Sequence, residues 1–300
     1  MADITTRFAD LGHITLHMAE SGAGADDLVI LLHGFPEFWY TWRKQLPALG
    51  ERYHAVAPDM RGYNLSDRPE AAEDYKIDRL VKDVLALASH LGHETFYLVS
   101  HDWGAAVAFS VALAAPERVS GLMVLNGAHP YIFAKLLETD ARQIEHSRYM
   151  TEFQDPATEE KLLADNCDWL WNWTFAEHEK RGLITPDEKA EYIKAWQKPG
   201  AVTAMLNYYR MSPVRPRPAS QGVKGLNLNP DHFRVKVPTY ILWGEQDHAL
   251  MPENLNGIEE FIHDLAIDRL PDVSHWVTHE APELVSEKVV SFIESLKARG

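Results

Sequence analysis

The sequence predicts an α/β fold with a doubly wound, mostly parallel sheet. Five short, β-rich apolar runs recur along the 300 residues, and helical patterns lie between them. The runs are continuously hydrophobic, which is typical of strands covered on both faces, as in a parallel sheet. They are "LVILLH" from Leu28, "HAVAPD" from His54, "FYLVSH" from Phe96, "GLMVLNG" from Gly121 and "TYILWGE" from Thr239.

Two segments with a one-sided apolar pattern are predicted as helices that flank this sheet. In "IDRLVKDVLALASHLG", from Ile77 to Gly92, apolar side chains recur at helical spacing, and the final glycine is a plausible C-cap. "ELVSEKVVSFIESLKARG", from Glu283 to Gly300, repeats the pattern at the end of the chain. Strands that alternate with such helices indicate an α/β architecture.

A long stretch before the fifth run breaks this alternation. It holds helical and aromatic segments but no convincing buried strand, so we predict a helical cap at 131–229, inserted in a core domain of residues 1–130 and 230–300. Near its end, "MSPVRPRPASQG" from Met211 is rich in proline and arginine and is predicted as an extended loop, whose mobility stays open. Ligands of open α/β sheets bind beyond the carboxyl ends of the strands. An insertion after Asn126 begins at that edge and is expected to close over the site as a lid.

Composition and charge indicate a protein that binds neither nucleic acid nor membranes. The 29 Lys and Arg against 44 Asp and Glu give a net charge of −15, which repels phosphate backbones and anionic lipids. The first residues lack the pattern of a secretory signal, and the apolar run from Gly104 to Ala115 is too short to span a bilayer. The only cysteine, Cys167, cannot form an intramolecular disulfide and is expected to be a buried, inert thiol. We therefore expect a soluble, cytoplasmic protein.

Polar residues with catalytic potential follow several of the predicted strands. Ser100-x-Asp102-x-Gly104 comes after a strand and before a small-residue helix, which is the pattern of a nucleophile elbow with aspartate at its apex. Small residues flank the apex because the turn is too sharp for bulky side chains. An acid, Asp247, and a histidine, His275, follow later in the chain. This order of nucleophile, acid and histidine is that of the α/β-hydrolase triad, and it predicts the α/β-hydrolase fold.

An aspartate at the apex predicts attack on an sp³ carbon. A serine hydroxyl that attacked such a carbon would give an ether, which no nearby base could hydrolyse at a useful rate. A carboxylate gives an ester instead, and water activated by a histidine can cleave that ester at its carbonyl. Epoxides and alkyl halides are the carbon electrophiles that fit this chemistry.

The other groups needed for ester hydrolysis have candidates in the same loops. The backbone N–H groups of Phe35 and Trp103 are predicted to form the oxyanion hole. His275 is predicted to be the base for water, and Asp247 is predicted to hold its tautomer. Their nearby rivals are His279 for the base and Glu245 for the acid. The sequence has no paired metal-ligand spacing such as H-E-x-x-H, so we expect neither a metal nor a cofactor.

Five stretches of the sequence match motifs of a known enzyme family. They are "HGFPE" from His33 with Trp39, Trp42 and Arg43, "DMRGY" from Asp59, "HDWG" from His101, "YMTEFQDP" from Tyr149 and "LNYYR" from Leu206. Together they resemble the soluble epoxide hydrolase family, and the likeness extends over most of the chain. The last two stretches resemble those that bear the family's ring-opening tyrosines, so the resemblance implies that Tyr149 and Tyr209 donate hydrogen bonds to the epoxide oxygen. Tyr208 stands where the family usually has tryptophan, and we expect it to tune the pocket rather than the chemistry.

The resemblance also implies a substrate class and a set of pocket residues. It implies an enzyme that converts small apolar epoxides to vicinal diols, as in detoxification, and that is a monomer or a homodimer. The residues expected to contact the substrate are His33, Pro36, Trp103, Tyr208 and Trp276. The tryptophans of "DWLWNWTF" from Asp168 are expected to pack between helices, with one edge at the pocket.

Three other functions remain open on the sequence. A haloalkane dehalogenase would share the nucleophile, the triad and Trp103, but a departing halide needs N–H donors, whereas a departing alkoxide needs acids such as the two tyrosines. A fluoroacetate-type dehalogenase would want arginines just after the nucleophile, where this chain has Trp103, Ala105 and Ala106. A binding protein that has kept the fold without turnover is the third alternative.

Overall fold

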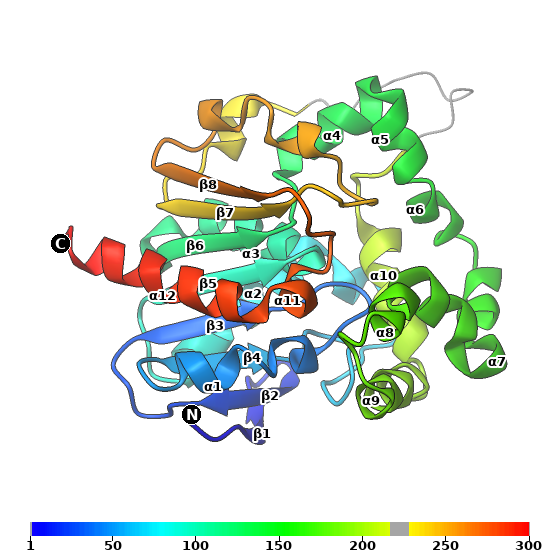
Figure 1. The fold of residues 1–300 in the computed structure, drawn as a ribbon, viewed down its shortest axis with the longest axis horizontal. Helices are drawn as coiled ribbons and strands as arrows, with labels where there is room; N and C mark the ends of the chain where they lie inside the picture. Colours follow the sequence, from blue (N-terminus) through cyan, green and yellow to red (C-terminus); the bar gives the residue numbers. More distant parts are fainter. Residues whose placement is uncertain (1, 217–227, 300) are drawn as a thin grey trace.

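An eight-stranded, mostly parallel sheet forms the centre of the molecule (Figure 1). The computed structural model describes residues 2–216 and 228–299. The strand order is β1-β2-β4-β3-β5-β6-β7-β8, and only β1 with β2 and β2 with β4 pair antiparallel. The strands are β1 (Thr5–Asp10), β2 (Thr15–Ser21), β3 (Leu28–Leu32), β4 (His54–Pro58), β5 (Phe96–His101), β6 (Val119–Leu125), β7 (Thr239–Gly244) and β8 (Leu265–Leu270). The predicted α/β-hydrolase fold class is confirmed.

The five apolar runs in the sequence correspond to β3, β4, β5, β6 and β7, while β1, β2 and β8 were not predicted. β1 and β8 are the sheet's edge strands, and their residues are largely exposed or half-buried, so they lack a continuous apolar run. β2 is buried but carries His17 and Glu20, whose side chains pair with Asp59 at 2.7 Å and with His54 at 2.9 Å. Such buried polar pairs satisfy their hydrogen bonds internally and hide the strand from a search for hydrophobic runs.

Helices cover both faces of the sheet. The helices outside the β6–β7 connection are α1 (Leu46–Leu49), α2 (Ile77–His90), α3 (Trp103–Ala114), α11 (Val277–Glu280) and α12 (Pro282–Lys297). In β3, Ile30 and Leu32 belong to the apolar cluster that includes α2 and α3, whereas Val29 and Leu31 belong to the cluster that includes α1 and α12. Successive side chains of a strand point to opposite faces, so this division shows that β3 is buried on both sides.

The connection between β6 and β7 forms a helical layer at one end of the sheet (Figure 1). We refer to its seven α-helices within the described ranges as the inserted helices. They are α4 (Pro130–Thr139), α5 (Ala141–His146), α6 (Tyr149–Glu152), α7 (Ala157–Thr174), α8 (Ala176–Lys180), α9 (Pro186–Trp196) and α10 (Ala201–Met211). The proline- and arginine-rich stretch predicted as a loop lies outside the described residues from position 217 onward.

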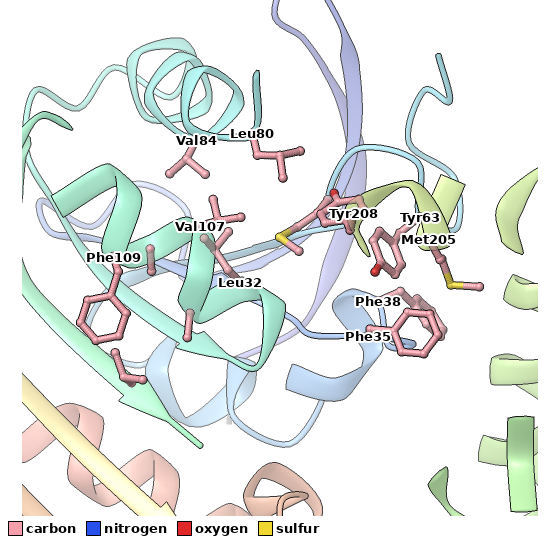
Figure 2. Packing of buried hydrophobic residues seen from close by; sticks show 14 of the residues in the cluster. Leu32, Phe35, Phe38, Tyr63, Leu80, Val84, Val107, Phe109, Met205 and Tyr208 are labelled. Atoms are coloured by element: carbon pink, nitrogen blue, oxygen red, sulfur yellow. The ribbon is translucent and has the colours of Figure 1, made fainter. Parts of the chain in front are cut away.

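The inserted helices share a hydrophobic core with the sheet and its flanking helices. Figure 2 shows Val84 of α2, Val107 of α3 and Leu32 of β3 in the same cluster as Met205 and Tyr208 of α10. Polar contacts add to this junction: Trp196 Nε1 donates to Pro36 O at 2.6 Å, Tyr208 OH donates to Arg61 O at 2.8 Å, and Arg43 Nε donates to Glu188 Oε1 at 2.7 Å. The inserted helices are therefore held over the carboxyl ends of β3 and β4.

The two predicted flanking helices are present. The first is α2, and Gly92 follows it at φ +85°, a left-handed conformation that suits a glycine after a helix C-terminus. The second is α12, whose buried Val285, Val289 and Ile293 lie on one side at helical spacing. Along the described ranges, no helix combines the length and the apolar character needed to cross a bilayer.

Candidate active site

Asp102 sits at a sharp turn between β5 and α3. The strand ends at His101, the helix begins at Trp103, and Asp102 between them has φ +50° and ψ −118°. A positive φ is unfavourable for a residue with a Cβ, by roughly 1–3 kcal/mol, and such strain persists only where the surrounding structure enforces it. A Cβ added to Gly34 would lie 2.5 Å from the Asp102 Cβ, and one added to Gly104 would collide with the Leu32 carbonyl. There is therefore no room for a side chain at Gly104, the small residue predicted after the apex, or at Gly34.

The two carboxylate oxygens of Asp102 have different surroundings. Oδ1 accepts a hydrogen bond from the backbone N–H of Phe35 at 2.7 Å. Oδ2 lies 3.7 Å from Nε2 of His275, too far for a hydrogen bond but close enough for electrostatic attraction. Oδ2 is thus the oxygen that faces His275.

His275 is held by Asp247, which follows β7. Nδ1 of His275 donates to Asp247 Oδ2 at 2.7 Å, and because a carboxylate only accepts, Nδ1 carries a proton and Nε2 faces Asp102. The other oxygen of Asp247 accepts from the backbone N–H groups of Ala249 at 2.7 Å and Leu250 at 2.8 Å. Burial would raise the pKa of Asp247, but the His275 charge and these hydrogen bonds lower it below its usual value. Asp247 is therefore a fixed negative charge behind the histidine.

The histidine itself has a raised pKa. Burial alone would lower it, but the charge and hydrogen bond of Asp247 and the charge of Asp102 together raise the pKa of His275 to about 9. In the unligated site at neutral pH, His275 is protonated between two carboxylates.

The two tyrosines singled out by sequence line the same cavities as Asp102. Tyr149 comes from α6 and Tyr209 from α10, and their ring centroids are 5.8 Å apart. Tyr209 also meets Phe35 and Trp103 edge to face, at 5.2 and 5.1 Å. Burial, reinforced by the Asp102 charge, raises the pKa of both phenols above the ordinary value. Both tyrosines therefore keep their protons and can act as hydrogen-bond donors.

Two cavities meet at Asp102, Tyr149 and Tyr209. One, of about 550 Å³, has a mainly apolar wall and is called here the apolar cavity; it is lined by residues such as Trp103, Leu113, Phe133, Met150 and Leu250. The other, of about 450 Å³, is also mostly apolar but has the larger polar share in its wall, so it is called the polar cavity; it is lined by aromatic residues such as Trp173 and Trp276 and by polar residues such as Thr174, His178, Arg181, Ser274, His275 and Glu280. Asp102 thus lines two cavities that differ in the polar share of their walls.

Comparison with known proteins identifies the family of the chain. Residues 27–282 match the family model described as alpha/beta hydrolase fold. The chain is 33% identical to the AB hydrolase superfamily protein YfhM of Bacillus subtilis, and the match covers 98% of this chain and 100% of YfhM. It is 31% identical to human epoxide hydrolase 4, and that match covers 96% of this chain and 78% of the relative. The crystal structure of a Bacillus megaterium epoxide hydrolase in complex with an inhibitor matches 96% of this chain and 100% of that one, with TM-score 0.86 and 34% identity. The chain belongs to the epoxide hydrolase family of the α/β-hydrolase superfamily.

Three of the five residues expected to contact substrate in this family member do line a cavity. Trp103 and Tyr208 line the apolar cavity, and Trp276 lines the polar one. His33 and Pro36 are placed differently. The His33 ring is fully buried, with Nδ1 at 2.9 Å from Gly34 O and Nε2 accepting from Met60 N at 2.9 Å, while Pro36 O accepts from Trp196. These hydrogen bonds hold the loop that presents Phe35, and the substrate contact expected of His33 and Pro36 stays a prediction.

The rivals for the triad positions have other partners. His279 is fully buried and donates from Nε2 to Glu37 Oε1 at 2.7 Å, away from Asp102. Glu245 pairs with Arg269 at the surface. Among the tryptophans of α7, Trp171 is buried, whereas Trp173, which was also expected to pack between helices, is 41% exposed and lines the polar cavity. Cys167 is buried, as predicted.

Several supporting residues were not found by sequence reasoning. Asn126, just after β6, donates from Nδ2 to Asp247 Oδ2 at 2.8 Å and to Gly244 O at 3.0 Å. The sequence signal that could have marked it is an asparagine directly after a predicted strand, and the structure shows it at φ +37°. The buried Glu37 accepts from His101 Nδ1 at 3.1 Å, and Nε2 of His101 donates to the His275 carbonyl at 2.9 Å. In the described ranges, no cluster of three or more histidine, cysteine or acidic side chains is arranged to hold a metal.

Proposed function

We propose that the protein is an epoxide hydrolase that opens small apolar epoxides to vicinal diols through an ester on Asp102. The observation that carries this proposal is a carboxylate nucleophile with two protonated phenols beside it, at the meeting point of two cavities. The family relationship supports the same activity. In this proposal residues 131–229 are the cap, residues 1–130 and 230–300 are the core, and no cofactor takes part.

In the first step, Asp102 Oδ2 attacks a ring carbon and the bond from that carbon to the ring oxygen breaks. The released oxygen takes a proton from Tyr149 or Tyr209, while the other phenol donates a hydrogen bond to it. The tyrosinate regains its proton from His275, which is protonated at rest because its pKa is about 9. The products of this step are a neutral hydroxyalkyl ester and a neutral histidine.

In the second step, neutral His275 takes a proton from a water molecule as the water oxygen attacks the ester carbonyl of Asp102. The oxyanion forms on Oδ1, which already accepts from the Phe35 N–H, and the N–H of Trp103 is the proposed second donor. The bond from the carbonyl carbon to the alkyl oxygen then breaks. The alkyl oxygen leaves with the proton of the added hydroxyl, so the diol departs and the carboxylate and protonated histidine are restored.

The direct test is one turnover of styrene oxide by excess enzyme in H₂¹⁸O. The ester route predicts an unlabelled diol and ¹⁸O in the peptide that contains Asp102, both measured by mass spectrometry. A labelled diol with unlabelled Asp102 would mean direct attack by water and would remove the assigned nucleophile. Halide release from a bromoalkane, without diol formation from epoxides, would favour the haloalkane dehalogenase instead, and turnover of neither would favour a binding protein.

A further inference from the structure

We propose that the two cavities divide the reaction: the apolar cavity binds the epoxide's substituent, and the polar cavity brings water to the ester. This inference rests on the proposed function, because it needs an ester on Asp102. It assigns as substrates those epoxides that carry one large, uncharged, apolar substituent and little or nothing on the other ring carbon.

The wall of the apolar cavity favours an uncharged hydrocarbon group. Ala106, Ser110 and Leu113 of α3 line it at positions i, i+4 and i+7, which is one face of a helix. Lys76 and Asp78, which also line it, are exposed residues, so their charges are hydrated. A charged substituent beside the apolar wall would lose its own hydration without gaining a partner.

The wall of the polar cavity offers water more polar partners than the wall of the apolar cavity does. Glu177 and Arg181 of the inserted helices and Asp272 of the loop after β8 line it, and so does the buried Glu280 of α11. The side chains of Glu177 and Arg181 are 68% and 48% exposed, so this wall is in contact with solvent. A hydrocarbon placed there would strip water from these charges, which is unfavourable.

The position of the base links the polar cavity to ester hydrolysis. Among the described residues that line the two cavities, His275 belongs to the polar cavity only, whereas Asp102 and both tyrosines belong to both. A water molecule that loses its proton to His275 Nε2 must stand on that side of the ester. The substituent, already bound in the apolar cavity when the ester forms, leaves the water side free.

The two roles can be separated by narrowing each cavity alone. Ser110→Trp narrows the apolar cavity, and Asn172→Trp narrows the polar one, while Ser110→Ala and Asn172→Ala are controls that keep the space. Ester formation on Asp102 and its decay are followed by mass spectrometry of enzyme quenched at successive times. The probes are styrene oxide, with a phenyl substituent, and 1,2-epoxypropane, with only a methyl group. Leu113→Trp and Glu177→Trp repeat the comparison if either first variant does not fold.

We expect Ser110→Trp to slow ester formation from styrene oxide by about 10-fold and from 1,2-epoxypropane by less than about 2-fold, with ester decay unchanged. We expect Asn172→Trp to slow ester decay by about 5-fold and to leave ester formation within about 2-fold of the parent. The division of roles would be overturned if Ser110→Trp slowed ester decay or if Asn172→Trp slowed ester formation. It would also be overturned if either variant slowed both steps equally. Absence of an ester in the unsubstituted enzyme would instead overturn the proposed function itself, and the inference with it.

Discussion

Nε2 of His275 lies 3.7 Å from Oδ2 of Asp102, so the proposed base and the proposed nucleophile interact through charge without a hydrogen bond. The charge of Asp102 is one of the causes that raise the pKa of His275 to about 9. In the proposed mechanism, ester formation removes that charge. It therefore lowers the pKa of His275 at the stage when the histidine must be neutral to accept a proton from water.

The first prediction concerns the pH dependence of the two steps. Hydrolysis of the ester needs neutral His275, so its rate should fall as the pH drops through the pKa of His275 in the alkyl-enzyme. Because the ester is uncharged, that pKa should lie below the value of about 9 in the unligated site. Single-turnover rates of ester decay measured from pH 5 to pH 10 would give it. An apparent pKa of 9 or more would show that the Asp102 charge does not govern the base.

The second prediction concerns Asp247→Asn. An amide cannot supply the charge that stabilises protonated His275, and its N–H₂ group can force the wrong tautomer on the ring. We expect ester decay to slow by about 10³-fold or more, while the ester still forms. An alkyl-enzyme that accumulates in quenched samples would be the sign. Equal loss of both steps would mean that Asp247 serves the nucleophile as well as the base.

The third prediction concerns the tyrosine pair. Tyr149→Phe and Tyr209→Phe each remove one donor to the ring oxygen, so each should slow ester formation by about 10²-fold, with a larger loss in the double variant. Ester decay should change little, because the phenols act on the departing oxygen. Tyr131→Phe is a matched control in α4, where the ring packs on Phe233 at 5.6 Å. Unchanged ester formation in both single variants would remove the assigned acids.

The sequence predicted the elements whose signal is local. Asp102 could be identified because a buried strand, a small-residue turn and a helix are consecutive in the chain. His33 and Pro36 belong to a matching motif, but the motif does not give the partners of their polar atoms: the His33 ring accepts from the Met60 backbone N–H, and the Pro36 carbonyl accepts from the Trp196 side chain. β2 was missed because its polar side chains find partners far away in sequence. Asn126 was missed for the same reason, since its contact with Asp247 joins two strand ends that only the sheet brings together.

The fourth prediction assigns Glu280 as a positioning residue for His275. Its side chain is 3% exposed and accepts from Ser274 Oγ at 2.6 Å, from Ser274 N at 3.2 Å and from His178 Nε2 at 2.6 Å. Burial would raise the pKa of Glu280, but the hydrogen bonds from His178 and Ser274 lower it to about 2. Glu280 therefore ties the residue before His275 to α8 of the inserted helices.

Glu280→Gln keeps one acceptor oxygen but loses the charge, so the loop that carries His275 should shift. We expect ester decay to slow by about 10-fold and ester formation to stay within about 2-fold, because only the second step uses the base. Glu188→Gln is the matched control. Glu188 accepts from Arg43 at 2.7 Å and so also joins the inserted helices to the rest of the chain, but it is not hydrogen-bonded to the loop that carries His275. Equal slowing by both variants would mean that Glu280 acts only by holding the inserted helices in place.

The same substitution has a signature in stability. Because the pKa of Glu280 is lowered from 4.5 to about 2, its contribution to the free energy of unfolding is present above pH 4.5 and is lost as the pH falls toward 2. Glu280→Gln should therefore destabilise the protein at pH 7, and the difference from the parent should shrink progressively below pH 4.5. Urea unfolding of both proteins at several pH values would measure this. If the loss of stability in Glu280→Gln stayed constant down to pH 2, the charge of Glu280 would contribute nothing to folding. The contact with Ser274 would then depend only on packing and on neutral hydrogen bonds.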